Sequence, residues 1–310
     1  MNIKKPKFWD LKKPNLISYL LTPFTLPLIV NNFFINKKKK VDGIKSICVG
    51  NIYVGGTGKT TTTIKLYEIL KKNYSKICTG KKFYINHQDE KSILENKTNL
   101  LSDDTRIKII EIAIKNKQKI IIFDDGLQDK KLDYDLKFVC FDSENWIGNG
   151  KLIPAGPLRE KISSLKKYDA VFLKDNEYDN EKLEIIKKYN SNIEVFNTTY
   201  QIKNLNLFDL SKKFLIFSGI GNPKNFRNIL KKNEFKIIDE IIFPDHFDYK
   251  QKNIDYIKNR AKKNDAEIIT TEKDFVKISK IDDKNINFLD IDLKIENEKK
   301  LIDFITKKIL

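Results

Sequence analysis

The sequence has few cysteines, and the three it has are not placed to act together. Cys48, Cys78 and Cys140 each fall in or beside an apolar run, without even pairing and without the close spacing of metal ligands. This pattern argues against a disulfide framework and against a cysteine-based metal site. We therefore expect buried thiols in a reducing compartment.

The sequence also lacks an uninterrupted membrane span. Residues 16–35 are mostly apolar, but a span needs about 20 apolar residues in succession. Two prolines and two asparagines break the run: Pro23, Pro27, Asn31 and Asn32. No A-x-A-like site follows it, so we expect no cleaved signal peptide.

Charge favours a membrane surface for this N-terminal part. Residues 1–43 carry nine lysines against Asp10 and Asp42. Basic residues on both sides of an apolar segment are attracted to anionic head groups. We expect peripheral attachment to the cytoplasmic leaflet; the alternative is a core helix of a soluble protein.

The whole chain has a net charge of +17. A clustered excess of this size would indicate a nucleic-acid partner. Here the lysines are spread over every segment and accompany many isoleucines and asparagines, which indicates a compositional bias. We expect no nucleic-acid partner. With 310 residues, 40% of them hydrophobic, the chain can bury two ordinary cores, and we expect two domains.

Residues 46–63, SICVGNIYVGGTGKTTTT, contain the strongest functional signal. An apolar run leads into a glycine-dense turn that ends in Lys59 and Thr60, and a potentially helical segment follows. Glycines let backbone N–H groups converge on phosphate oxygens, the lysine adds a charge for the outer phosphates, and the threonine hydroxyl can ligate Mg²⁺. The template G-x-x-x-x-G-K-[ST] has a glycine where this chain has Tyr53. Strand, phosphate loop and helix in this order predict nucleotide binding.

A second apolar run ends in acidic residues. Residues 120–123 are fully apolar, as expected of a strand buried on both faces, and Asp124 and Asp125 follow. In P-loop proteins an acidic residue at the tip of a neighbouring strand holds Mg²⁺. The doublet and the loop together predict a magnesium–nucleotide site.

Residues 148–160, GNGKLIPAGPLRE, are too rich in glycine and proline for a helix interior or a central strand. They predict a structured loop beyond a strand end, carrying Asn149, Arg159 and Glu160. Arg159 is a candidate for stabilising transition-state charge, and Glu160 for the metal shell. The alternative is a surface ion pair between the last two.

Two further stretches carry ionisable candidates. Residues 79–91, TGKKFYINHQDEK, are polar and are predicted to form a loop holding His87, Asp89 and Glu90. His246 follows FPD at 243–245, and an imidazole with its usual pKa near neutrality suits proton handling. The alternative for each of the two stretches is an ordinary solvated turn. Residues 103–118 have the apolar spacing of a capped amphipathic helix.

Strands and helices alternate through the rest of the chain, including a strand and glycine-rich turn at 213–223 without a phosphate-loop lysine. The predicted fold class is α/β: a P-loop NTPase-like, mostly parallel sheet flanked by helices, with a second, smaller α/β/α domain joined by a strand linker. The expected division is a membrane-associated segment at 1–43, a P-loop domain at 44–195, a linker at 196–212 and a C-terminal domain at 213–310.

Six motifs occur along the chain in an order that can be compared with known families: VGNIYVGGTGKT, DDGLQ, GNGKLIPAGPLRE, FSGIGNP, FPDH and TTEKD. They span about residues 45–277, and with the basic apolar N-terminus they resemble the tetraacyldisaccharide 4'-kinase family, the lipid A 4'-kinases. The resemblance implies an ATP-dependent lipid kinase that phosphorylates the 4'-hydroxyl of tetraacyldisaccharide 1-phosphate to form lipid IVA. It also implies a place on the cytoplasmic face of the inner membrane, peripheral or N-terminally anchored.

The resemblance also implies roles for particular residues. ATP would be cradled by the loop residues Tyr53, Val54, Gly55, Gly56, Thr57, Gly58, Lys59 and Thr60. Lys59 would contact the transferring phosphate. The Mg²⁺ environment would be formed by Thr60, Asp124, Asp125 and Glu160, with Gln128 nearby. Asp89 would be the base, assisted by His246.

The sequence departs from the family pattern at several points. The arginine-glycine-tyrosine-glycine segment of the family reads TGKKFY here, and the stretch from it to the Asp-Glu pair is shorter. The G-D-E-P motif reads QDEK at 88–91. Thr61 replaces a common proline, and Asp129 and Phe247 each replace a histidine.

Two other functions compete with this interpretation. A ParA-like or MinD-like ATPase that binds DNA or membrane would also carry GGTGKTT, but those proteins have a lysine before the glycine pair, where this chain has Val54. A soluble small-molecule kinase would use residues 1–43 as a core helix.

Overall fold

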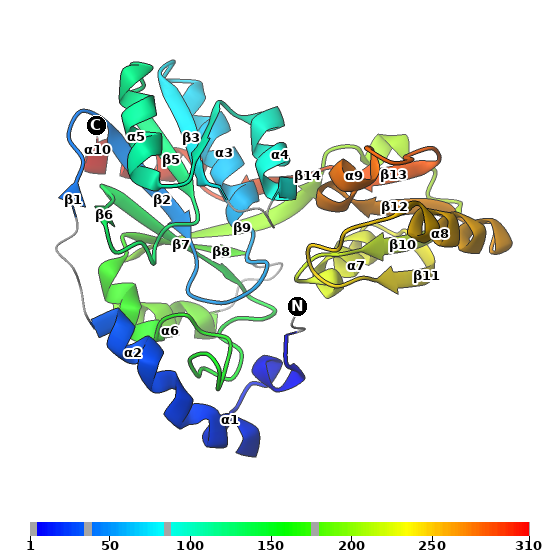
Figure 1. The fold of residues 1–310 in the computed structure, drawn as a ribbon, viewed down its shortest axis with the longest axis horizontal. Coiled ribbons are helices and arrows are strands. Elements are labelled where there is room, and N and C mark those ends of the chain that lie inside the picture. The colour runs from blue at the N-terminus through cyan, green and yellow to red at the C-terminus, as the bar shows by residue number, and fades with distance from the viewer. Residues whose placement is uncertain (1–4, 34–38, 84–87, 175–179, 310) are drawn as a thin grey trace. The chain divides into compact units, whose positions relative to one another are not determined.

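The chain folds into two compact units (Figure 1). The computed structural model describes residues 5–33, 39–83, 88–174 and 180–309. Of these, the larger unit holds 5–83, 98–199 and 293–309, and the smaller unit holds 88–97 and 200–292.

Two helices group by their contacts rather than by chain order. Helix α4 (Gln88–Lys97) belongs to the smaller unit, where it packs against α9 (Glu272–Ile278). Helix α10 (Glu298–Ile309) belongs to the larger unit, where its buried face joins the core. The boundaries predicted above follow chain order and remain a prediction.

An eight-stranded sheet forms the centre of the larger unit. From edge to edge its strands are β14 (Ile291–Ile295), β9 (Glu194–Ile202), β8 (Ala170–Lys174), β7 (Leu136–Asp142), β2 (Lys45–Gly50), β5 (Ile120–Asp124), β3 (Ile77–Lys82) and β4 (Leu100–Asp103). Every neighbouring pair from β9 to β4 is parallel. The loops that follow β2 and β5 therefore leave from the same edge of the sheet, where α/β proteins bind their ligands.

The strands are apolar on both faces because helices cover both. The α-helices of the larger unit include α3 (Lys59–Lys71), α5 (Arg106–Lys115), α6 (Asn180–Tyr189) and α10. The unit also has the short 3₁₀ helices η1 (Lys7–Asp10), η2 (Thr22–Thr25) and η4 (Ile162–Lys167). A separate two-stranded sheet pairs β1 (Lys39–Lys40) with β6 (Leu132–Asp133). Ile47 and Val49 face a core built with α3 and α10, while Cys48 faces one built with α5.

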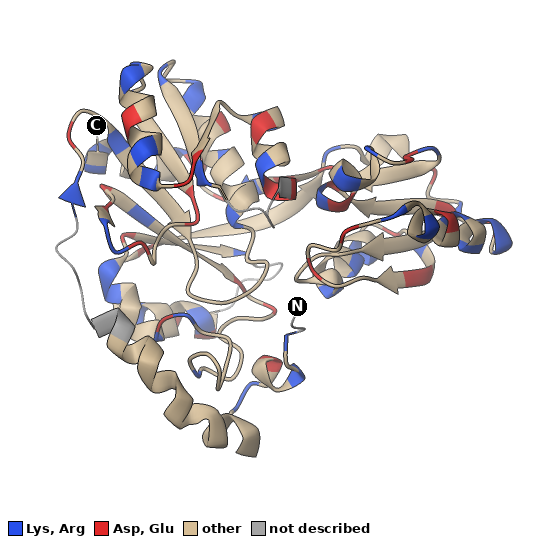
Figure 2. Ribbon diagram, in the orientation of Figure 1, with Lys and Arg blue, Asp and Glu red and all other residues tan. Residues whose placement is uncertain are grey.

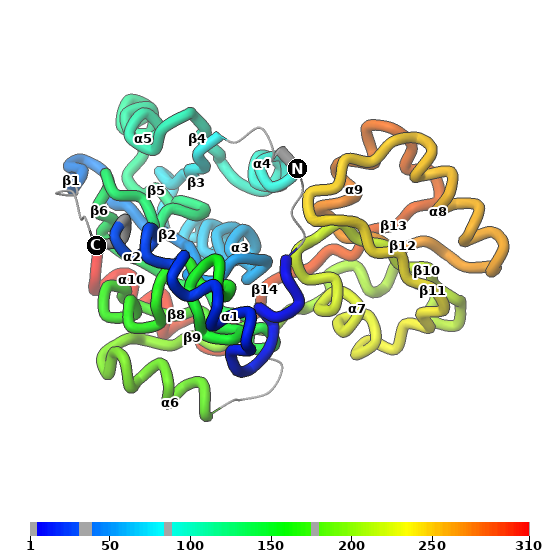
Figure 3. The backbone as a smooth tube through the Cα atoms, turned by 60° about the horizontal axis from the view of Figure 1, so that its bottom comes forward, coloured from blue at the N-terminus to red at the C-terminus, as the bar shows by residue number. Residues whose placement is uncertain are grey.

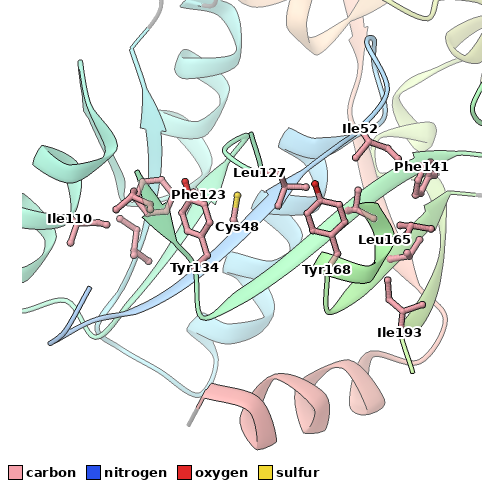
Figure 4. Packing of buried hydrophobic residues seen from close by; sticks show 14 of the residues in the cluster. Cys48, Ile52, Ile110, Phe123, Leu127, Tyr134, Phe141, Leu165, Tyr168 and Ile193 are labelled. Carbon is pink, nitrogen blue, oxygen red and sulfur yellow. The ribbon is translucent and has the colours of Figure 1, made fainter. Parts of the chain in front are cut away.

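Figure 4 shows the second of these cores, with Cys48 among aromatic rings. The rings of Phe123 and Tyr134 lie 5.5 Å apart between centroids. All three cysteines are buried, as predicted. Burial raises the pKa of Cys78 and that of Cys140 to about 12, so these thiols stay protonated at neutral pH.

The apolar N-terminal segment forms two short helices, α1 (Leu16–Leu21) and α2 (Leu26–Phe33), joined by η2. Pro27 lies in the first turn of α2, where its missing N–H costs nothing. Along the part of the chain that the structure describes, no helix is both long enough and apolar enough to cross a membrane.

The smaller unit is a three-layer α/β/α sandwich, as predicted. Its parallel sheet has the order β11 (Lys236–Ile242), β10 (Lys213–Ser218), β12 (Glu267–Thr271), β13 (Ile286–Leu289). Helix α7 (Pro223–Lys232) packs on one face, and α8 (Gln251–Lys263) on the other. The turn η5 (Leu205–Leu207) follows β9.

The loop predicted for residues 79–91 is wrong at both ends. Strand β3 continues to Lys82, because its pairing with β4 extends that far. Helix α4 begins at Gln88, so Asp89 and Glu90 lie in its first turn, where acidic side chains favour the helix dipole. His87 lies outside the described residues.

Candidate active site

Two glycines and one asparagine fix the conformation of the phosphate loop in the larger unit. Gly55 and Gly58 have φ angles of +140° and +81°, which a residue with a side chain rarely adopts. Asn51 is fully buried, and its amide donates to the hydroxyl of Thr57 at 2.9 Å. The loop thus has a fixed backbone before α3 begins at Lys59, and N–H groups at the start of a helix bind anions.

Tyr53 opens the predicted nucleotide loop, but its side chain belongs to the core. The ring is 2% exposed and packs with Leu152 and Leu158. Its hydroxyl donates to Asp10 at 3.1 Å and contacts Lys5. The backbone of Val54 donates to the carbonyl of Pro157. Tyr53 therefore fastens the loop to the 148–160 segment, and its ring is not available to a nucleotide.

Asp124 ends β5 and Asp125 follows it, beside the start of α3. The hydroxyl of Thr60 donates to Oδ2 of Asp124 at 3.0 Å, and Nζ of Lys59 lies 3.7 Å from Oδ2 of Asp125. Arg159 also reaches Asp125, at 3.2 Å. The structure therefore brings together five of the predicted site residues.

Asp125 is ionised in this arrangement. Burial by itself would raise its pKa, but the charges of Lys59 and Arg159 outweigh that effect and hold the pKa below its usual value. Its φ angle is +60°, an uncommon backbone conformation outside glycine and asparagine-like residues. A strained residue at a strand end is typical of a functional position.

The residues present suit a magnesium ion that is shared with a nucleotide. Mg²⁺ takes oxygen ligands and is bound in proteins through one or two carboxylates together with substrate phosphates. Oδ1 of Asp124 is buried without a hydrogen-bond partner among the described residues, so an oxygen ligand is available. Within the described ranges no group of three or more His, Cys, Asp or Glu side chains could hold a metal by itself.

Gln128 and Glu160 form a separate network behind the aspartates. The amide of Gln128 donates to Glu160 at 2.8 Å, and Tyr168 donates to the same oxygen at 2.8 Å. Arg159 donates to the side-chain amide oxygen of Gln128 at 3.3 Å. Arg159 and Glu160 are thus joined through Gln128 rather than directly. Hydrogen bonds through Gln128 and Arg159 therefore link Glu160 to Asp125.

Asn149 holds the N-terminal segment rather than a ligand. Its amide group donates to Ser18 at 2.9 Å, and its backbone N–H donates to the carbonyl of Trp9. Figure 3 shows η1 and α1 running beside this green stretch of the larger unit.

Asp89 and His246 meet inside the smaller unit. Nδ1 of His246 lies 3.1 Å from Oδ2 of Asp89, whose side chain is 1% exposed. The two residues are 157 positions apart, and α4 supplies one of them. His246 has a φ angle of +57° in the turn after β11.

Two lysines of α9 complete this cluster. Nζ of Lys277 lies 3.1 Å from Asp89, and Nζ of Lys273 lies 3.3 Å from Nε2 of His246. Burial would raise the pKa of Asp89, but the hydrogen bond from His246 and the charges of Lys273 and Lys277 outweigh it and hold the pKa well below the usual range. Asp89 is therefore ionised, and it orients the imidazole.

The aspartate of TTEKD has a structural role. Asp274 is fully buried and accepts hydrogen bonds from the backbone of Gly219 and the hydroxyls of Thr271 and Tyr249. It fixes the turn after β10 to the start of α9.

We expect Asp274→Ala to destabilise the protein by about 3 kcal/mol or more, because three buried donors lose their acceptor. Urea unfolding followed by circular dichroism measures this. Asp283→Ala, a change at an aspartate outside this network, serves as the control. A midpoint equal to that of the control would contradict the structural role.

Reasoning from sequence missed Lys81, Lys273 and Lys277. Lys81 contacts Asp124 from β3. Lys273 lies within TTEKD and Lys81 within TGKKFY, but lysines are common throughout this chain and no role was assigned to either, and nothing in the sequence distinguishes Lys277. Their roles depend on which strand or helix lies beside the aspartates.

A phosphate loop opening a helix, with an aspartate pair at the end of the adjacent parallel strand, defines a P-loop nucleotide-binding protein. The model of the family described as "Tetraacyldisaccharide-1-P 4'-kinase" matches residues 27–79 and 85–310. The chain belongs to this family, and it is a kinase.

Individual relatives agree with this assignment. The tetraacyldisaccharide 4'-kinase of Pelagibacter ubique is 46% identical over 99% of this chain and 98% of its own length. That of Rickettsia canadensis is 36% identical over 98% of this chain and 97% of its own length. A crystal structure of LpxK from Aquifex aeolicus in complex with ATP has a TM-score of 0.69 at 22% identity, covering 95% of this chain and 100% of that one. The last match shows the shared fold. A ParA-like or MinD-like ATPase is not favoured.

Proposed function

We propose that the protein transfers the γ-phosphate of ATP to the 4'-hydroxyl of an acylated glucosamine disaccharide 1-phosphate at the cytoplasmic face of the inner membrane. One observation carries the donor half: Lys59 and Thr60 at the start of α3 meet Asp125 and Asp124 at the end of β5. The acceptor is taken from the family to which the chain belongs.

On this proposal the loop residues hold the triphosphate through their backbone N–H groups. Lys59 would exchange Asp125 for the outer phosphates, since an ammonium on a flexible stem can change partners. Arg159, held by Asp125 and Gln128, supplies a second positive charge for the oxygens of the transferring group.

Thr60, Asp124 and Asp125 would hold Mg²⁺, with Gln128 and Glu160 supporting Arg159 behind them. When bound, the metal neutralises charge on the phosphate oxygens. Phosphoryl transfer depends mainly on positioning and charge, so these residues suffice on the donor side.

The acceptor hydroxyl must lose its proton, and we assign this step to the pair Asp89 and His246. The carboxylate of Asp89 orients the imidazole of His246 through the contact of 3.1 Å. The proton that leaves the acceptor hydroxyl is then shared between the imidazole and the carboxylate. The residues assigned to the donor side belong to the larger unit, and this pair belongs to the smaller unit.

The direct test incubates the purified protein with Mg-ATP and tetraacyldisaccharide 1-phosphate in detergent and measures the bisphosphate by mass spectrometry. We expect conversion that requires ATP and the disaccharide. ATP hydrolysis without phosphorylated lipid would contradict the proposal.

An exposed apolar surface on α1, η2 and α2 supports attachment to a membrane. Figure 2 shows these helices without charged residues. Five large apolar side chains there are between 58% and 74% exposed: Leu16, Tyr19, Leu20, Phe24 and Leu26. An acylated acceptor stays in the bilayer, since each CH₂ in the acyl region contributes about 0.8 kcal/mol. A helix pair lying in the interface would bring the kinase to it.

We expect the double change Leu20→Glu, Phe24→Glu to weaken binding to anionic phospholipid vesicles by at least about tenfold, because each side chain loses roughly 1.5–3 kcal/mol of burial. Point changes are preferable to deletion, because Asn149 bonds to Trp9 and Ser18. Leu207→Glu, at an apolar residue of the smaller unit that is 74% exposed, is the control. If both variants bound vesicles equally in sedimentation assays, α1, η2 and α2 would not form the membrane contact.

A further inference from the structure

A buried lysine lies on the carboxylate that we assign to the metal. Nζ of Lys81 contacts Oδ2 of Asp124, the same oxygen that accepts the hydroxyl of Thr60. The side chain of Lys81 is 7% exposed and that of Asp124 is 0% exposed. Burying an ion pair costs desolvation energy that its attraction only partly returns, so the pair is not explained by stability alone.

The strand register determines this contact. Strands β3 and β5 are parallel neighbours, with Gly80 opposite Phe123. Lys81 and Asp124 follow these residues on their own strands and project to the same face of the sheet. The lysine therefore approaches the metal-binding edge from a strand that is not part of the phosphate loop.

Basic side chains already meet the carboxylates at this edge without a metal. Among the described side chains, Asp124 is met by Lys81, and Asp125 by Lys59 and Arg159. Cations from β3, from α3 and from the 148–160 segment thus reach the two carboxylates. In addition, Oδ1 of Asp124 is buried and lacks a partner among the described residues, which indicates a ligand on that side.

We propose that Lys81 is a resident counter-ion of the nucleotide site: it holds Asp124 in place and supplies part of the positive charge that Mg²⁺ otherwise brings to the triphosphate. The inference rests on the proposed ATP site and deepens it. ATP then binds appreciably without metal, and Mg²⁺ tightens ATP binding by a smaller factor than it does in a protein without this lysine.

The prediction concerns the coupling between two ligands. The factor by which Mg²⁺ tightens ATP binding equals the factor by which ATP tightens Mg²⁺ binding. Removing Lys81 takes a cation from metal-free ATP and frees Asp124 for the metal, so both changes raise this factor. For unit charges a few ångströms apart near a protein surface, we expect a rise on the order of tenfold.

Calorimetric titration of the full-length protein with ATP, in EDTA and in excess MgCl₂, measures the factor. We expect Lys81→Met to weaken ATP binding about tenfold in EDTA and by less than about threefold in MgCl₂. Lys81→Arg, which keeps the charge, should retain the wild-type factor. Lys82→Met, at the next residue of β3 and on its opposite face, is the matched control and should also retain it.

A wild-type factor in Lys81→Met overturns the inference, whether ATP binding is unchanged or is weakened equally in both buffers; an equal loss would mean a structural role only. If the wild-type protein binds no ATP in either buffer, the proposed nucleotide site itself fails.

Lys81→Met leaves a buried carboxylate without its counter-ion and could unfold. The test is then made in the Asp124→Asn background, where that carboxylate is neutral. Adding Lys81→Met to Asp124→Asn should weaken ATP binding in EDTA by about tenfold. Equal binding by the single and double variants overturns the inference.

Discussion

Lys59→Ala is expected to lower kcat by at least about 10²–10³-fold, the loss typical of removing one preorganised donor to a developing charge. In the structure Lys59 is the first residue of α3, and its Nζ lies 3.7 Å from Asp125. A contact this long at a side chain 16% exposed is easily exchanged for a phosphate. Lysine at this position therefore serves the triphosphate more than the fold.

Steady-state kinetics with Mg-ATP and the lipid acceptor measure this effect. Lys71→Ala, at the other end of α3, is the matched control, and its kcat should remain within about twofold, the range of ordinary surface changes. A thermal melt of both variants separates catalysis from folding. If Lys59→Ala retained most of its turnover, the phosphate loop would not be the donor site.

The elements around the phosphate loop could be predicted because their local signals agree with the fold. The run before the loop became β2, and the run at 120–123 became β5 next to it, with the two aspartates at its end. The helix expected at 103–118 became α5, and its start is capped by the hydroxyl of Thr105. Buried parallel strands are continuous apolar runs, so their positions can be read locally.

Helix α4 could not be predicted, because its stability comes from distant residues. Its sequence, QDEKSILENK, is mostly polar. It is held by packing on α9 and by Lys97, which reaches Glu272 at 2.6 Å and Asp290 at 3.3 Å. A helix that depends on such contacts leaves little local pattern. The same reason hid Lys81, Lys273 and Lys277, whose partners are set by the tertiary fold.

The structure also sharpens the choice of proton acceptor. The residues alone made Asp89 and His246 separate candidates, each with an ordinary surface alternative, and only the family resemblance joined them. Their contact, and the burial of Asp89, make them a pair. Four charged side chains lie in or beside this cluster: Glu90, Asp245, Lys273 and Lys277. Cations around Asp89 lower its basicity, so we expect His246 to take part in accepting the proton.

Asp89→Asn and His246→Ala are each expected to lower kcat by about 10²–10⁴-fold, the usual contribution of a positioned base. Because the two residues act as a unit, the double variant should be only slightly slower than either single variant. The measurement is lipid phosphorylation by all three proteins under identical conditions. Multiplicative losses in the double variant would contradict a shared role.

Stability must be measured beside activity, because Asp89 also neutralises Lys277. Its pKa is lowered in the folded protein, so its contribution to stability is complete above the usual aspartate value of about 3.9 and is lost as the pH falls towards the folded-state value. At neutral pH, Asp89→Asn should therefore cost about 3–5 kcal/mol, the range for breaking a buried pair.

Asp245→Asn separates these two effects. This carboxylate lies 3.8 Å from Lys273 and 3.9 Å from His246, but it is 43% exposed, so its loss should change stability by less than about 1 kcal/mol and kcat only slightly. His246→Ala leaves Asp89 paired with both lysines, so it should lose far more activity than stability. If His246→Ala and Asp245→Asn had the same turnover, the imidazole would have no part in taking the proton, and Asp89 would have to act alone against the cations that hold it ionised.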